Sequence, residues 1–223
     1  MTSFTRQVYA VFAKDVVLEL RTRDALGAMV VFALLVLVTF NFTLDLRPEL
    51  LAAVGHGVLW VSIVFAGTLG LGRAFAVERE GGTLEGLLMA PLDRSALYLA
   101  KVLSSLIFMG VVEAVGVVAF VALFDARVDA GRLLGALSLG TVGLGAVGTL
   151  LSGIAANTRA REVMLPLLLF PIIVPLLIGV VESSGAALDP LTGQGAPWLS
   201  LLAAFDLVYL ALGAVAFDYI LEE

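Results

Sequence analysis

The chain has 223 residues, of which 61% are hydrophobic and 14% are charged, and its formal net charge at pH 7 is −6. Soluble globular domains carry about a quarter charged residues, so this composition excludes a soluble domain and predicts a membrane protein, as does the mean hydropathy of +1.07. The absence of cysteine excludes disulfides and thiolate metal sites.

Residues 1–24 form a charged, amphipathic segment, which we predict to be an N-terminal interfacial helix and a region separate from the rest. Its charge, and the length of the apolar run that follows, argue against a cleaved signal peptide. Phe12, Asp15 and Glu19 are spaced i, i+3 and i+7 and therefore share one helical face. Two interpretations stay open: a plain interfacial helix in which Glu19 pairs with Arg23, or a contact with a partner protein.

Residues 25–223 are predicted to be one domain of six transmembrane helices. Backbone polar groups in lipid must be paired internally, which allows only helices or a closed barrel, and the apolar runs lack the alternation of barrel strands. The third run is longer than a bilayer requires, so we expect it to tilt or to begin in the interface near Lys101. The predicted spans are 25–44, 54–75, 95–124, 133–155, 164–181 and 198–221.

Basic residues set the orientation. Of the 13 lysines and arginines, four lie in the N-terminal segment, four in the connection between the second and third spans, and two between the fourth and fifth. Because basic residues concentrate on the cytoplasmic side, we predict that both termini and the second connection are cytoplasmic.

That second connection, residues 78–91, is a polar insert in an otherwise apolar region. Gly82 lets the chain turn, Thr83 provides an N-cap, and Pro91 ends the short helix. The helix is predicted to lie at the membrane surface and to dock into a nucleotide-binding subunit as a coupling helix; an ordinary surface loop is the alternative. The candidate coupling residues are Glu78, Glu80, Gly82, Thr83, Leu84, Glu85, Leu87, Leu88 and Pro91.

Polar residues and prolines inside the spans are candidates for a gate or pathway. Pro166, Pro171 and Pro175 interrupt the fifth span, which predicts a mere kink, or a hinge or a broken helix beside a pathway. Glu113 and Asp206 fall inside the third and sixth spans, where we expect a carboxylate to face the bundle interior or to be protonated. They are interpreted either as a polar lining or proton-sensitive gate, or as buried acids bonded to neighbouring helices.

Two further patterns concern packing. Small residues recur every four positions on the fourth span and predict close helix approach, more often within a subunit than between subunits. The two tryptophans are expected to lie in the interfacial belt. The small residues are Thr141, Gly145, Thr149 and Gly153, and the tryptophans are Trp60 and Trp198.

Catalytic signatures are absent from the sequence. It contains no G-x-x-x-x-G-K-[ST], no H-E-x-x-H and no G-x-S-x-G, so it has neither a P-loop for ATP nor a recognisable hydrolase motif. We therefore interpret the chain as a transport subunit and not an enzyme, with its energy supplied by a partner.

The insert resembles the signature of ABC-2-type exporter permeases, through Glu78-x-Glu80-x-Gly82-Thr83-Leu84-Glu85-x-Leu87-Leu88-x-x-Pro91. Further matches narrow the resemblance to the CcmB (haem exporter protein B) family of the cytochrome c maturation system, over essentially the whole chain. These are Trp60-Val61, Arg73-x-Phe75, Pro91-Leu92, Ala100-Lys101, the proline-rich run 165–178, and the F-x-x-D-x-x-x-E pattern of Phe12, Asp15 and Glu19.

The resemblance implies a multi-pass protein of the bacterial inner membrane. Two copies would pair with two copies of a separate ATP-binding subunit that holds the ATP, and the N-terminal face would contact that subunit. It also implies a haem-handling membrane protein and a periplasmic haem chaperone as partners, and no nucleic acid. Haem would be cargo, or ATP would drive release of the loaded chaperone. We favour the second because His56, the only histidine, lacks a second haem ligand, and we expect no directly bound cofactor.

Other functions stay open. The chain could be an ABC-2 permease for a drug, lipid or glycan, or a proton-coupled secondary transporter that uses Glu113 and Asp206. A passive membrane scaffold is a further alternative, and it would tolerate charge reversal throughout the insert.

Overall fold

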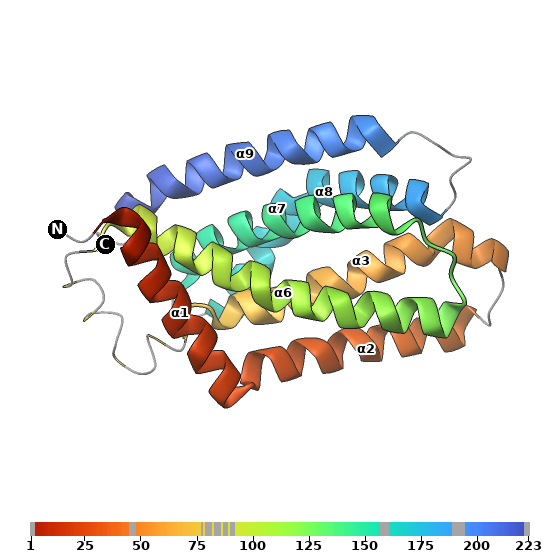
Figure 1. The fold of residues 1–223 in the computed structure, drawn as a ribbon, viewed down its shortest axis with the longest axis horizontal. Coiled ribbons are helices and arrows are strands. Elements are labelled where there is room, and N and C mark those ends of the chain that lie inside the picture. The colour runs from red at the N-terminus through yellow and green to blue at the C-terminus, as the bar shows by residue number, and fades with distance from the viewer. Residues whose placement is uncertain are drawn as a thin grey trace.

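Every regular element in the described part of the chain is a helix (Figure 1). The computed structural model describes residues 3–44, 48–76, 78, 82, 86, 89, 92–156, 161–188 and 195–220. The helices are α1 (Phe4–Thr22), α2 (Asp24–Leu44), α3 (Pro48–Arg73), α6 (Arg94–Phe124), α7 (Ala130–Ala156), α8 (Arg161–Leu188) and α9 (Gly195–Ile220).

Six of these helices are long and apolar enough to cross a membrane, as the sequence predicts, and the chain is an all-α integral membrane protein. Each spanning segment begins and ends within a few residues of its predicted bounds, except at the far end of the fifth, which extends to Leu188. The segments are Asp24–Leu44, Val54–Arg73, Arg94–Phe124, Ala130–Ala156, Val163–Leu188 and Pro197–Ile220.

Helix α1 lies across one end of the bundle, steeply inclined to the spans, and both ends of the chain lie at that same end (Figure 1). Arg23 joins α1 to α2 in a left-handed conformation with φ of 58°, and its N–H bonds to the carbonyl of Glu19. The carboxylate of Glu19 then accepts a bond from Leu26 N at 2.7 Å, which satisfies a donor at the start of α2. The joint is therefore one residue long and bonded on both sides.

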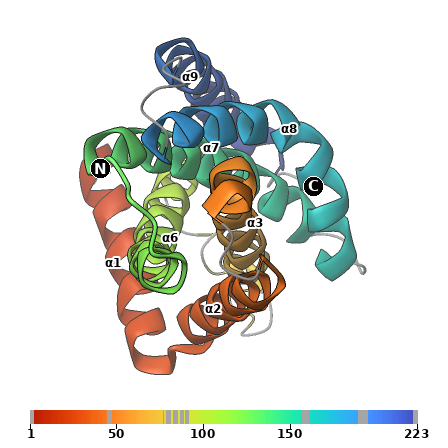
Figure 2. The same cartoon turned by 90° about the vertical axis from the view of Figure 1, so that its right-hand side faces the viewer.

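Helix α7 lies at the centre of the bundle, packed by α3, α6, α8 and α9 (Figure 2). Its small residues leave room for large side chains from these neighbours. A Cβ on Gly140 would lie 2.2 Å from Cη2 of Trp60, and one on Gly148 would lie 2.3 Å from Cδ1 of Leu71. The composition of α7 therefore determines which helix occupies the centre.

The predicted four-residue stripe on α7 also packs closely within the chain. A Cβ on Gly145 would be 3.2 Å from Leu106, and one on Gly153 would be 2.9 Å from Phe217. The close approach predicted from the spacing is confirmed, and it joins α7 to α6 and α9.

The belt position predicted for Trp60 is wrong. Its side chain is 1% exposed, and its indole N–H donates to the hydroxyl of Ser184 on α8 at 2.8 Å. A buried tryptophan needs a partner for this donor, and the polar residue that provides it lies 124 positions away. Trp198 is half-buried.

The fifth span is not broken. Helix α8 continues from Arg161 to Leu188 with Pro166, Pro171 and Pro175 inside it. Neighbouring helices often stabilise prolines in transmembrane helices, and α8 packs against α3, α7 and α9. The broken-helix alternative is therefore wrong.

Candidate functional site: a buried charge cluster beside the insert

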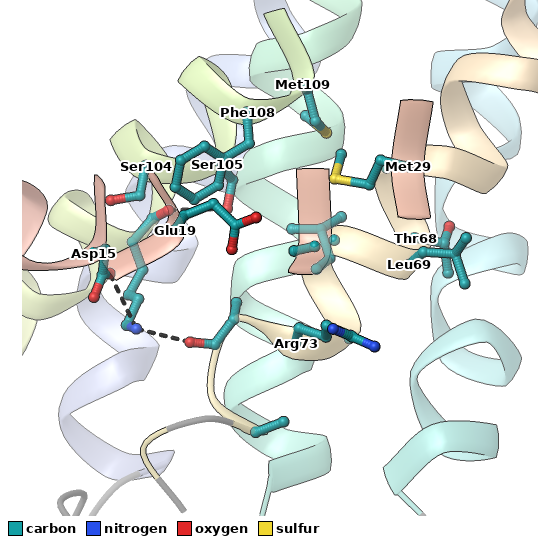
Figure 3. Close-up of a pocket in the computed structure, with 18 of the residues that line it drawn as sticks. Asp15, Glu19, Met29, Thr68, Leu69, Arg73, Ser104, Ser105, Phe108 and Met109 are labelled. Carbon is teal, nitrogen blue, oxygen red and sulfur yellow. Dashed lines mark hydrogen bonds and ion pairs between the residues drawn. The ribbon is translucent and has the colours of Figure 1, made fainter. Parts of the chain in front are cut away.

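Four charged side chains meet at the end of the bundle where α1 lies, and Asp15 is the one of them that Figure 3 labels. Lys14 and Asp15 come from α1, Glu78 follows α3, and Lys101 belongs to α6. Lys14 Nζ lies 2.8 Å from Asp15 Oδ1 and 2.7 Å from Glu78 Oε1. Lys101 Nζ lies 3.0 Å from Asp15 Oδ2 and also binds Glu78 Oε1. We call these four side chains, two positively and two negatively charged, the lysine–carboxylate cluster.

Lys101 is the most buried member of this cluster and is 4% exposed. Besides the two carboxylates, its ammonium donates to the carbonyl of Ala74 at 2.7 Å and lies 5.1 Å from the centre of the Phe75 ring. An ammonium has three donors, and the protein supplies three acceptors from two other segments. A cation buried to this degree is stable only when it is paired in this way.

Apolar packing brings α1 into position for these contacts. Val11 is buried in a cluster with Leu97 and Tyr98 of α6, and Phe12 packs against the same cluster. Asp15 follows Val11 by four residues, so it lies on the same side of α1, one turn further along. Gln7 adds a polar contact, since its side-chain oxygen accepts from the backbone N–H of Asp93 at 3.0 Å.

Electrostatics favour the charged forms of the cluster. Burial alone would raise the pKa of Glu78, but Lys101 and Lys14 outweigh burial and hold that pKa below its ordinary value. Burial would likewise lower the pKa of Lys14, but Asp15 and Glu78 outweigh it and raise that pKa. Because the pKa of Glu78 is lower in the folded state than in the unfolded state, its ionisation stabilises the fold at pH values above the unfolded-state pKa. This stabilisation is lost as the pH falls through the folded-state pKa. Because the pKa of Lys14 is higher in the folded state, its protonation stabilises the fold at pH values below the unfolded-state pKa. This stabilisation is lost as the pH rises through the folded-state pKa. The shifts therefore keep Glu78 and Lys14 charged at neutral pH.

A cavity of about 710 Å³ adjoins the cluster and is bordered by α1, α2, α3, α6 and α8 (Figure 3). Its polar lining includes Asp15, Glu19 and Arg73, and Met29 and Met109 line it between α2, α3 and α6. Three members of the cluster, Asp15, Glu78 and Lys101, thus line a partly open cavity at this end of the bundle.

Of the predicted coupling residues, the structure describes Glu78 and Gly82. Gly82 has φ of 64° and is exposed, which agrees with the turn predicted there. Glu78 is buried in the lysine–carboxylate cluster and is not at the surface. The other predicted coupling residues lie outside the described residues: Glu80, Thr83, Leu84, Glu85, Leu87, Leu88 and Pro91.

Phe12, Asp15 and Glu19 share one face of α1, as predicted, and this face points toward the chain's own bundle. Asp15 binds the two lysines, and Phe12 packs in the apolar cluster. The predicted pairing of Glu19 with Arg23 is replaced by the bond from Leu26 N, because the sharp joint turns α2 toward the Glu19 carboxylate. Contact with a partner through these three residues stays a prediction.

The intramembrane acids lie apart from the lysine–carboxylate cluster and on different sides of α7. Glu113 accepts a hydrogen bond from Thr141, whereas Asp206 packs against α7 at Gly143. Positions two apart on a helix do not face the same way. Within the described part of the chain, neither carboxylate oxygen of Asp206 has a hydrogen-bond partner.

The solitary histidine lies near the opposite end of the bundle. His56 is half-buried, and its ring lies beside Gly185 of α8, where an added Cβ would be 3.8 Å from Nε2. Among the described residues, no group of three histidine, cysteine, aspartate or glutamate side chains could hold a metal ion.

Sequence reasoning missed the role of Lys101 and Lys14, although one signal was available. They are the only two lysines in the chain, and Lys101 begins an apolar stretch of a spanning helix. A lysine at such a position is rare and points to a buried acidic partner. The spacing of residues could not identify that partner, because Asp15 and Glu78 come from segments far away in the sequence.

Asp15→Lys is expected to release α1 from the bundle, because it places a third cation beside Lys14 and Lys101. Uncompensated buried charge costs about 3–5 kcal/mol, more than a surface helix retains by packing alone. The measurement is proteolysis of α1 in the purified protein, with cleavage at Arg6, Arg21 and Arg23 expected to accelerate. Glu19→Lys is the comparison, since it loses only the bond to Leu26. Equal protection of both variants would contradict the prediction.

Comparison with known proteins identifies the family. A sequence model of the CcmB protein family matches residues 6–222. The chain is 31% identical to "Heme exporter protein B" of Rhodobacter capsulatus over 170 residues, which cover 76% of this chain and 78% of the relative. It is 30% identical to the protein of the same name from Paracoccus denitrificans over 211 residues, covering 93% and 94%. Another relative of that name, from Bradyrhizobium diazoefficiens, is 28% identical and covers 93% of each chain. With the matched region spanning all six transmembrane segments, the chain belongs to the CcmB family.

Proposed function

We propose that this chain is the permease subunit of an ABC-type haem export system in the bacterial inner membrane. Family membership carries the proposal, because relatives similar over most of the chain are named for haem export. The architecture supports it: the connection between α3 and α6 leaves the bundle at the end that also holds α1 and both termini (Figure 1). With the basic residues concentrated on that side, this end is cytoplasmic.

In this proposal a separate ATP-binding subunit supplies the energy, and two copies of each subunit form the complex. ATP binding closes the pair of ATPase subunits. This closure displaces the predicted coupling helix, residues 83–90, which docks on the ATPase. The displacement shifts the spans between two packings, and this requires the nucleotide-bound ATPase to bind one packing more tightly than the other. The output is haem delivery for cytochrome c assembly, through transfer of haem or release of a haem-loaded periplasmic chaperone. A haem-handling membrane protein completes the system.

The N-terminal helix contributes to this assembly in two ways. Its Phe12–Asp15–Glu19 face binds the chain's own helices, so it positions α1 at the cytoplasmic end. We propose that α1, held there, forms part of the surface on which the ATPase docks.

Deleting the gene tests the proposal. We expect loss of c-type cytochromes and their recovery when the intact gene is returned, and we expect a tagged chain to co-purify with an ABC ATPase. Normal cytochrome c in the deletion strain, together with loss of a drug, lipid or glycan export activity, would instead identify an ABC-2 permease for another cargo.

The two intramembrane acids are the observation that favours a proton-coupled secondary transporter. That mechanism requires them to exchange protons, whereas the structure places them on different sides of α7. We expect Glu113→Gln to retain cytochrome c assembly within about threefold, because the amide still accepts the bond from Thr141. Asp206→Asn is expected to behave similarly. The measurement is haem-stained cytochrome c at equal amounts of inserted protein. Complete loss in both variants, with transport that follows a pH gradient, would support the secondary transporter.

A further inference from the structure

We propose that Lys101 is a positioning residue that attaches both the insert and α1 to the third span, α6. Its use in coupling rests on the proposed function, but the attachment itself does not. Displacement of the insert at Glu78 would then reach α6 through this buried side chain, in addition to the covalent connection and the packing of α1 against α6.

The geometry around the ammonium group carries this inference. Lys101 lies in the second turn of α6, and its Nζ binds Asp15 of α1 at 3.0 Å. The same Nζ binds Glu78, the first residue of the insert, and the carbonyl of Ala74 at 2.7 Å. α1 and the segment 74–78 are therefore both held to α6 by one cation, through an ion pair with Asp15 and hydrogen bonds to Ala74 and Glu78.

Burial makes this attachment strong. Lys101 is 4% exposed, and the side chains of Asp15 and Glu78 are 9% and 5% exposed. Exposed ion pairs exchange with water and are screened by salt, whereas buried pairs are screened much less. Without Lys101, the two carboxylates would share only the half-exposed ammonium of Lys14. Lys101 therefore holds Glu78 and Asp15 to α6 at this point.

Lys14 offers a matched comparison within the same cluster. It binds the same two carboxylates, at 2.8 and 2.7 Å, but it belongs to α1 and its side chain is 42% exposed. Lys14 can join α1 to Glu78, but it cannot join either of them to α6. The two lysines thus share the same ion pairs and differ in the helix that they anchor.

The test uses the absence of cysteine in the chain. Tyr9 on α1 and Met89 in the insert are 69% and 85% exposed, so Tyr9→Cys with Met89→Cys provides two spin-label sites. Distances between the labels would be measured on the purified full chain in lipid nanodiscs. We expect a narrow distribution in this background and with Lys101→Arg, and a distribution about twofold wider with Lys101→Met. Lys14→Met is expected to keep the distribution narrow. A narrow distribution with Lys101→Met, or equal widening by both methionine variants, would overturn the proposal.

A triple variant keeps the test decisive if Lys101→Met fails to insert. Asp15→Asn, Glu78→Gln and Lys101→Met together remove the buried cation and both acids, so the one charge left in the cluster is that of Lys14, whose side chain is 42% exposed. This triple variant is expected to insert and to show the wide distribution. The wild-type narrow distribution in the triple variant would also overturn the attachment.

Coupling is measured separately. We expect Lys101→Met to co-purify with the ATPase but to reduce cytochrome c assembly by at least about tenfold, whereas Lys101→Arg restores it. Normal assembly with Lys101→Met would overturn the role of Lys101 in coupling. If the unmodified chain neither bound an ATPase nor supported cytochrome c assembly, the proposed function would fail, while the spin-label distances would still decide the attachment.

Discussion

Glu85→Arg is expected to leave the protein inserted in the membrane but to weaken its association with the ATPase by about 30-fold. The predicted coupling helix places Leu84, Leu87 and Leu88 on one face and Glu85 on another, so the acid is available to a basic partner surface. Like-charge contact across an interface costs several kcal/mol; roughly 2 kcal/mol corresponds to the stated change in affinity. The measurement is co-purification of the ATPase at several salt concentrations, together with cytochrome c assembly.

A matched control is available at the opposite end of the bundle. Glu182 is an exposed glutamate on α8, and Glu182→Arg makes the same charge change away from the insert. It is expected to leave ATPase binding unchanged. Normal ATPase binding and normal cytochrome c assembly with Glu85→Arg would show that the insert is not the coupling element.

Gly140→Ala is expected to lower the free energy of unfolding by about 1–3 kcal/mol, the range for overpacking a dense core. The added carbon would lie 2.2 Å from Trp60 Cη2 and 2.7 Å from Val180 Cγ1. The Trp60 ring cannot simply rotate away, because its N–H is bonded to Ser184. The measurement is denaturant or thermal unfolding in a mild detergent.

Gly27→Ala is the control for this substitution. Gly27 is exposed on α2, and an added Cβ there meets no atom within 4 Å. In a helix interior alanine is favoured over glycine by about 1 kcal/mol, so Gly27→Ala is expected to be neutral or stabilising. Equal destabilisation by both substitutions would contradict the central packing of α7.

Local chemistry explains why the spans could be predicted. A run of apolar residues must form its backbone hydrogen bonds within one helix, so segment length and hydropathy already determine six helices and their approximate bounds. The amphipathic N-terminal helix follows in the same way from its residue spacing. These properties depend on neighbours within a few positions in the sequence.

The rest depends on which segments meet. Trp60 fits an interfacial residue by sequence, but its partner Ser184 is on another helix. Asp15 and Glu78 fit surface acids that a partner protein could bind, but each finds Lys101 of the same chain. The prolines of α8 allow a kink, a hinge or a break when the helix is considered alone, and the helix is continuous where it packs against its neighbours. The insert's docking surface depends on a second protein, so the fold of this chain does not determine it.

Both lysines of the chain are occupied in the lysine–carboxylate cluster, and this has a chemical consequence. Apart from the terminal α-amino group, the protein offers amine-directed reagents only one partly accessible site, Lys14, whose ammonium is already paired. Acylation or amine-to-amine bridging will therefore report almost entirely on partner subunits. Reagents that react with carboxylates, or with introduced cysteine thiols, can label or cross-link this subunit within its assembly.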